Sequence, residues 1–110
     1  MDISEKAKEF AEAIKSTPEF SELRRARAVA LKNGDLKAEL DELSKRQMDL
    51  YTSKMQRKDK ESVLSEIDEK FTRLSRMPDA DSFFKALKKF NELTARVFKS
   101  INEYLEKGLK

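Results

Sequence analysis

The stretch FFKALKKFNELTARVFKSINEYL, residues 83–105, decides the fold class. Its apolar side chains recur every three or four residues, which is the period of one face of an α-helix. Seven positions fall close to a single line along that helix: Phe83, Leu87, Phe90, Thr94, Val97, Ile101 and Tyr104. Five more residues widen the apolar arc on its two sides: Phe84, Phe98, Leu105, Ala86 and Leu93. An arc of nearly half the circumference is wider than contact with one neighbouring helix requires.

This helix is expected to run from about Ala80 to Lys107, with Asp79 or Asp81 as its N-cap and Gly108 as its end. About 28 residues at a rise of 1.5 Å give a length of roughly 40 Å. A 110-residue domain is hardly longer than that in any direction. We therefore expect the helix to contact several helices of its own chain and to continue into a partner subunit.

The same period predicts four further helices, over about residues 3–15, 18–32, 36–57 and 60–76. Asp2 is the expected N-cap of the first helix, and Thr17 followed by Pro18 begins the second. Gly34, in the left-handed conformation, is expected to end the second helix, and Asp35 to cap the third. The polar run RKDKES, residues 57–62, is the expected exposed turn between the third and fourth helices.

Composition supports this all-α assignment. The 110 residues include only two Gly and two Pro, too few for the turns of a β-rich domain, and 41% of the residues are charged. Length and the lack of repeats predict one helical domain, residues 1–110. We expect an antiparallel bundle of about five helices with a long C-terminal helix, assembled as a dimer or a higher homo-oligomer.

The residue types that are missing exclude several kinds of site. With no Cys and no His, the chain has no thiolate metal site, no usual zinc site and no Ser-His-Asp triad. The carboxylate clusters fall on polar helix faces, where burial does not tune their pKa. We therefore predict a non-enzymatic protein with no cofactor and no metal. The charged N-terminus and the lack of an apolar run of about 18 residues predict a cytoplasmic protein without membrane insertion.

Several stretches resemble the bacterial YlbF/YmcA/YheA family. They are residues 13–26 (AIKSTPEFSELRRA), the region from Gln47 to Gln56, and Met77-Pro78 followed by Phe83-Phe84-Lys85-Ala86 and Leu93. Length and the extended C-terminal helix look most like the YheA branch. The chain departs from the family pattern at Arg57-Lys58, where Gly is common, and at Ala86-Leu87, where Ala-Glu is common.

The resemblance implies an all-α protein that self-associates and acts as a regulator or adaptor. Some family members act with the membrane-anchored ribonuclease Y in RNA maturation and influence competence, sporulation and biofilm formation. Members of that complex are linked to iron–sulfur clusters held by Cys. This chain has no Cys, so that property does not carry over. The YheA branch brings no established biochemical role.

We predict that a helical interface, formed with a second copy and then with a partner protein, carries the function. Leu36, Leu40, Leu43, Gln47 and Leu50 follow the 4-3-4-3 spacing of a packed helical seam. The residues expected at the interface are Leu43, Gln47, Leu50, Phe84, Leu87, Phe90, Phe98 and Ile101. The alternative is an RNA-binding accessory module that uses the basic residues at the expected turn: Lys54, Arg57, Lys58 and Lys60.

Overall fold

The computed structural model describes residues 2–52 and 56–110. These residues form five α-helices and no strand, which confirms the all-α prediction. The helices are α1 (Ile3–Lys15), α2 (Pro18–Lys32), α3 (Gly34–Thr52), α4 (Arg57–Leu74) and α5 (Pro78–Leu109). The expected long C-terminal helix is α5, with 32 residues.

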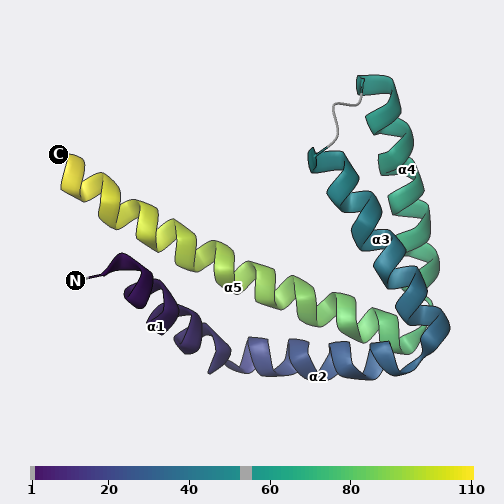
Figure 1. The fold of residues 1–110 in the computed structure, drawn as a ribbon, viewed down its shortest axis with the longest axis horizontal. Helices are drawn as coiled ribbons and strands as arrows, with labels where there is room; N and C mark the ends of the chain where they lie inside the picture. The colour runs from purple at the N-terminus through teal and green to yellow at the C-terminus, as the bar shows by residue number, and fades with distance from the viewer. Residues whose placement is uncertain (1, 53–55) are drawn as a thin grey trace.

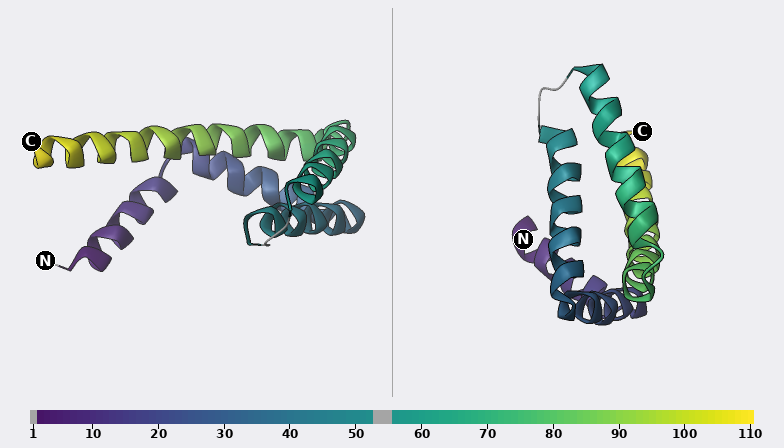
Figure 2. Two further views of the ribbon diagram at one scale, coloured as in Figure 1. Left: turned by 90° about the horizontal axis from the view of Figure 1, so that it is seen from above. Right: turned by 90° about the vertical axis from the view of Figure 1, so that its right-hand side faces the viewer.

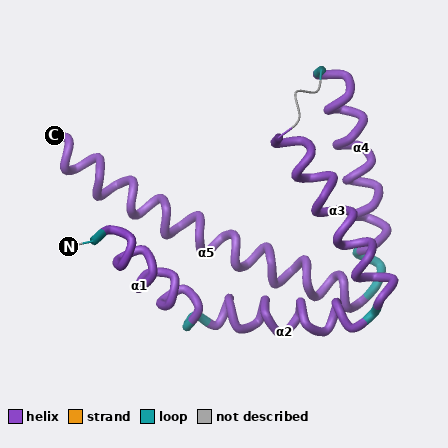
Figure 3. Tube along the Cα trace, in the orientation of Figure 1, coloured by secondary structure: helices purple, strands orange, loops and turns teal. Residues whose placement is uncertain are grey.

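The helices pack as two antiparallel pairs that meet at a corner (Figure 1). Helices α2 and α5 lie side by side in one arm, and α3 and α4 form a hairpin in the other arm. The chain turns the corner twice, between α2 and α3 and between α4 and α5 (Figure 3). The molecule therefore has the shape of an open V, with extents of 47 × 37 × 21 Å. The expected antiparallel packing takes the form of two pairs set at an angle.

Helix α1 stands largely apart from the rest of the chain. It diverges from α5, as the left view of Figure 2 shows, and it makes its few contacts with α2. None of its residues is buried, although Ile3, Ala7, Phe10, Ala11 and Ile14 form an apolar stripe at helical spacing. Its apolar face is thus almost free of cover by its own chain.

The core lies at the corner and between α3 and α4. The residues that are less than one-tenth exposed are Ala30, Leu36, Leu40, Leu43, Val63, Ile67, Leu74, Ala80 and Ala86. All but Ala86 form one cluster, against which Leu50, Phe83 and Phe84 also pack. Close packing at the corner relies on small residues, since Ala30 and Ala80 are fully buried where helices of the two arms approach.

Two predicted helix starts are confirmed. The Asp2 carboxylate accepts a hydrogen bond from the Ser4 backbone N–H at 2.9 Å and so caps α1. The Thr17 hydroxyl oxygen accepts from the Phe20 N–H at 3.2 Å, directly before Pro18 at the first turn of α2. Each side chain satisfies a backbone donor that the first turn of a helix leaves unpaired.

The residues predicted to end α2 and to cap α3 are wrong. Gly34 does not adopt a left-handed conformation; it is the first residue of α3. Asn33 caps that helix instead of Asp35, because the Asn33 side-chain oxygen accepts from the N–H groups of Asp35 and Leu36 at 3.1 and 3.2 Å. Asn33 itself is extended, so the chain turns the corner at one residue without a positive φ.

The predicted turn at residues 57–62 is also wrong, because α4 already begins at Arg57. Helix α3 is described as far as Thr52; residues 53–55 of its expected range to Arg57 lie outside the described residues, and Gln56 is not helical. Arg, Lys and Glu are good helix formers, and Asp59 in the first turn suits the positive end of the helix dipole. A charged run of this kind therefore extends a helix as readily as it interrupts one.

The ends of α5 differ from the prediction in the same way. The helix begins at Pro78, after the extended residue Met77, whose side chain makes no capping bond. Asp79 and Asp81 lie within the first turn and are not the caps. Gly108 does not stop the helix, which continues to Leu109.

Candidate interaction surface

The chain exposes far more surface than a compact protein of its mass. Its accessible surface is 9014 Å², whereas a compact monomer of 12.8 kDa exposes about 6,300 Å². Its radius of gyration is 17.4 Å, against about 13 Å for a compact 110-residue domain. The open V thus leaves an excess of about 2,700 Å² per chain, which is more than one partner contributes to a standard protein interface.

Part of the exposed surface is apolar and begins at the corner where the two arms meet. Phe71, Phe84 and Leu87 line a pocket of about 160 Å³ at the corner, together with polar residues of α3 that include Ser44 and Gln47. Helical spacing extends this surface along both arms. We define the inner face by nine residues: Met48, Tyr51, Leu64, Phe71, Phe84, Leu87, Phe98, Ile101 and Leu105.

The residues predicted on α5 divide into three environments. Phe84 and Leu87 are half-buried at the corner. Phe90 is also half-buried, but it packs against α2, where its ring centroid lies 5.8 Å from that of Phe20. Phe98 is 60% exposed and Ile101 is 38% exposed. The C-terminal half of the helix therefore keeps an apolar face that its own chain leaves open.

The residues predicted on α3 separate in the same manner. Leu43 is 5% exposed and belongs to the core, packed between α3 and α4. Leu50 is half-buried at the edge of that core. Gln47 is exposed and lines the corner pocket with Phe84 and Leu87. Of the three, Gln47 has the placement of a surface residue, and Leu43 is inaccessible to another chain.

Five inner-face residues are not among the interface residues predicted from the sequence: Met48, Tyr51, Leu64, Phe71 and Leu105. Met48 and Tyr51 are 61% and 88% exposed, and both follow Ser44 and Gln47 by one helical turn. Phe71 and Leu64 are 44% and 48% exposed and lie seven residues apart on α4. The sequence does contain a signal for the residues of α3 and α4: each of these helices has a second apolar line, about a quarter turn from the line that forms the core.

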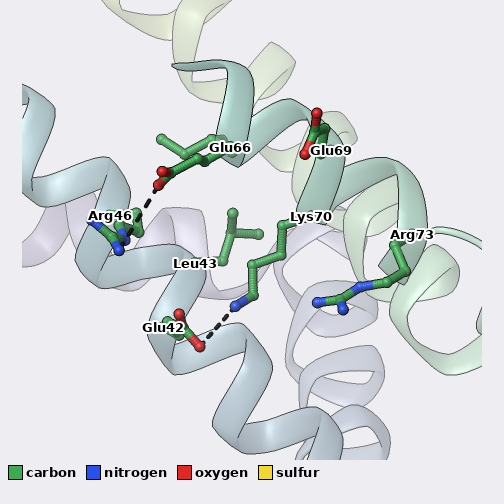
Figure 4. A pocket seen from close by; sticks show the side chains of 8 residues that line it. Glu42, Leu43, Arg46, Glu66, Glu69, Lys70 and Arg73 are labelled. Carbon is green, nitrogen blue, oxygen red and sulfur yellow. Dashed lines mark ion pairs between the residues drawn. The ribbon is translucent and has the colours of Figure 1, made fainter. Parts of the chain in front are cut away.

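A network of ion pairs links α3 to α4 along the hairpin (Figure 4). The Lys70 ammonium lies 2.8 Å from the Glu42 carboxylate and 3.3 Å from that of Glu39. Arg73 is 2.7 Å from Glu39, and Arg46 is 3.8 Å from Glu66. These pairs connect the two helices of the hairpin, so the hollow that they line is a structural contact.

The Lys70–Glu42 pair changes the proton affinity of both partners. The hydrogen bond from Lys70, with its positive charge, lowers the pKa of Glu42 below its ordinary value. The same hydrogen bond raises the pKa of Lys70, against the opposing effect of its burial. Both shifts favour the charged forms, as expected for a salt bridge and not for a general acid or base.

The basic residues of the RNA alternative lie at the first turn of α4. Arg57, Lys58 and Lys60 are exposed there, at the tip of the α3–α4 arm (Figure 1). The Arg57 guanidinium pairs with Glu61 at 3.3 Å, and Asp59 lies among the three basic residues. Lys54 lies outside the described residues. The local positive charge is therefore partly neutralised.

Two further properties concern the part of the chain that the structure describes. No helix there is both long enough and apolar enough to cross a membrane. Over residues 2–52 and 56–110, no three carboxylates are grouped closely enough to hold a metal ion.

The sequence matches the family model described as control of competence regulator ComK, YlbF/YmcA over residues 3–106. The chain belongs to the YlbF/YmcA family. The match confirms the resemblance and does not single out the YheA branch. None of the curated proteins and none of the solved structures compared with the chain gives a match.

Proposed function

We propose that this YlbF/YmcA family member is a non-enzymatic regulatory adaptor. It pairs with a second copy of itself through the inner face and offers its remaining apolar surface to a partner protein. The observation that carries this proposal is the excess of about 2,700 Å² of exposed surface over a compact chain. A stable dimer needs about 800 Å² from each partner. The excess is therefore sufficient for a second copy and for a further contact.

The inner face fits this role because its exposed side chains are large and contiguous. Phe98 and Leu105 are 60% and 63% exposed, and Ile101 lies between them on the same side of α5. Transfer of such side chains from water to an interface is favourable by about 25 cal/mol for each Å² of apolar area. Gln47, Phe84 and Leu87 continue the surface to the corner, so that it spans both arms.

The charged groups support an adaptor over an enzyme. Lys70, the least exposed of the ion-paired lysines, is held between Glu39 and Glu42 where α4 meets α3. This arrangement fixes α3 against α4. It also favours the charged form of the lysine, which does not suit a general base. The apolar inner face, in contrast, offers contact area and no group that activates a substrate.

The experiment is light scattering coupled to size exclusion, with the wild-type chain and two variants. Phe98→Asp places a charge in the middle of the open surface without removing a core residue. Thr72→Asp places the same charge on the side of α4 away from the core and is the matched control. We expect wild type and Thr72→Asp to have twice the mass of 12.8 kDa, and Phe98→Asp to be monomeric with unchanged helicity. Equal masses for the two variants would contradict the proposed surface.

The RNA alternative is tested on the same proteins, because its residues lie at a distance from the inner face. A labelled RNA that binds at low salt, and is lost on combined Lys58→Glu and Lys60→Glu substitution, would favour the alternative. Binding of a phosphate backbone would weaken steeply with added salt. We expect no such binding, because Asp59 and Glu61 offset the basic residues of that turn.

A further inference from the structure

Helix α5 carries a regular seam that its own chain leaves largely uncovered. It has the alternating three- and four-residue spacing of a coiled coil. Its members are Phe84, Leu87, Asn91, Thr94, Phe98, Ile101 and Leu105. The seam lies beside the stripe that faces α2, in which Phe90 packs against Phe20. Helix α5 therefore has two apolar lines: one packs against α2 of the same chain, and the other is largely exposed.

The middle of the open seam is polar. Asn91 is exposed and Thr94 is half-buried, while two apolar residues of the seam precede them and three follow. A polar side chain at a single seam position commonly fixes the register and orientation of a helix pair, because other registers bury it against apolar groups. The order apolar, polar, apolar therefore limits the ways in which two copies of α5 can pair.

We propose that two copies of this chain pair through antiparallel α5 seams, with Asn91 of each copy opposite Thr94 of the other. This inference rests on the proposed self-association and adds its geometry. In this register Leu87 lies opposite Phe98 of the second copy, and Phe84 lies opposite Ile101. Apolar layers then flank a polar centre on both sides. A shift of one seam layer places the Asn91 amide against Ile101 or against Leu87, where no polar partner receives it.

The length of α5 supports the same register. The helix runs from Pro78 to Leu109, so its midpoint lies between Leu93 and Thr94. The proposed pairing is centred between Glu92 and Leu93, only one residue away. The register that matches polar with polar thus also overlaps the two helices along almost their whole length. Because burial stabilises in proportion to area, this coincidence favours the proposed register over the shifted ones.

The V shape favours antiparallel over parallel pairing. The α3–α4 arm rises from the N-terminal end of α5 (Figure 1). Phe71 of α4 contacts Phe84 of α5 there, with ring centroids 4.5 Å apart. In a parallel pair both arms stand at the same end, and the exposed C-terminal half of each α5 meets only its counterpart. In an antiparallel pair the arms stand at opposite ends.

Antiparallel pairing also covers the exposed apolar residues of the arm. It brings residues 98–105 of the second copy into the notch of the V, beside the inner-face residues of α3 and α4. Phe98 and Leu105 are 60% and 63% exposed in the single chain, and Met48 on α3 is 61% exposed. Each copy thus supplies the apolar surface that the other lacks, and the inner face becomes continuous.

The test uses the absence of cysteine from the wild-type sequence, which makes every introduced thiol unique. Leu87→Cys and Phe98→Cys chains are mixed, equilibrated and oxidised under mild conditions, and the products are separated without reductant. A disulfide forms only where the two Cα atoms approach within about 7 Å. We expect a cross-linked dimer to predominate in the mixture and to be almost absent when Phe98→Cys is oxidised alone.

The opposite pattern overturns the inference. Cross-linking of Phe98→Cys with itself, and none between the two different chains, would show a parallel pair. Cross-linking in neither sample would show that the seams do not meet. Light scattering on the same samples distinguishes the proposed self-association from the proposed pairing geometry. A dimeric mass with the wrong cross-links would contradict the geometry alone. A monomeric mass would contradict the self-association as well.

Discussion

The ring centroids of Phe71 on α4 and Phe84 on α5 lie 4.5 Å apart. This contact joins the two arms of the V at the corner, beside the core residues Leu74 and Ala80. Phe84 also lies 5.9 Å from Phe83, so the stack continues toward the core of the corner. The angle between the arms, and with it the shape of the inner face, therefore depends on this aromatic pair.

Removal of this pair is expected to loosen the corner. Phe71→Ala loses the stacking and part of the burial of a half-exposed ring, for a destabilisation of about 1–2 kcal/mol. The matched control is Phe10→Ala on α1, where a ring of similar exposure packs on no core, and we expect a change below about 0.5 kcal/mol. Urea denaturation at one low protein concentration measures both. Equal losses would show that the corner does not depend on the pair.

The start of α3 offers a test in which the expected sign is unusual. Gly34 has no positive φ, and a Cβ added to it meets no atom within 4 Å. We therefore expect Gly34→Ala to stabilise the protein by about 0.4–1 kcal/mol, because it reduces the freedom of the unfolded chain. Thermal unfolding measures the change. A loss of stability would instead indicate that Gly34 adopts the left-handed conformation that the sequence predicts.

Removal of the N-cap of α3 is expected to lower the stability of the protein. Asn33→Ala removes the side-chain oxygen that accepts from the Asp35 and Leu36 N–H groups, at a cost of about 1 kcal/mol. Asn33→Asp keeps an acceptor at this position and is the conservative control. Unfolding of all three proteins in urea makes the comparison. An unchanged midpoint for Asn33→Ala would contradict the capping geometry.

The Lys70–Glu42 pair predicts a specific pH dependence. Because the pKa of Glu42 is lowered in the folded state, the pair stabilises above the ordinary Glu pKa of 4.5 and is lost as the pH falls through the lowered value. The raised pKa of Lys70 keeps its contribution throughout the neutral range, up to alkaline pH. We expect the stability difference between wild type and Lys70→Met to shrink on acidification and with added salt. A difference independent of pH would show that packing of the lysine stem dominates.

Helix α1 is expected to open most easily. None of its residues is buried, and it packs on α2 near one end. Amide hydrogen exchange reports local opening, so α1 amides should exchange much faster than those around Leu40 and Leu43 of α3. Equal protection of α1 and α3 would mean that another surface covers the stripe of α1 in solution.

The polar centre of the seam gives a last prediction. Asn91→Leu removes the group that disfavours the shifted register, in which Leu87 lies opposite Leu105 of the second copy. With Leu87→Cys and Leu105→Cys introduced into Asn91→Leu chains, we expect a cross-link that the Asn91 background does not give. The same faint cross-link in both backgrounds would show that Asn91 does not set the register.

The helices of this chain could be predicted from the sequence because their apolar spacing is regular. Asp2, Thr17 and Pro18 carry local capping chemistry, and the structure places each one as expected. The errors occur where two local signals compete. Asn33 and Gly34 both suit a helix end, and the tertiary corner selects the side-chain cap over the left-handed glycine.

The candidate surface could be predicted only in part. Periodicity shows which residues are apolar on one face, but it does not show which of two faces the chain covers by itself. Leu43 and Gln47 follow the same line on α3, yet Leu43 is buried and Gln47 is exposed. The difference depends on where the arms diverge, and that is a property of the corner, not of either helix.

Small-angle scattering over a dilution series tests the central claim most directly, because it reports mass and size together. The account predicts twice the mass of 12.8 kDa at high concentration. On dilution, or for Phe98→Asp, the mass should fall to one chain with a radius of gyration near 17.4 Å. A single-chain mass with a radius of about 13 Å at every concentration would contradict the account, because the chain would then close on its own inner face.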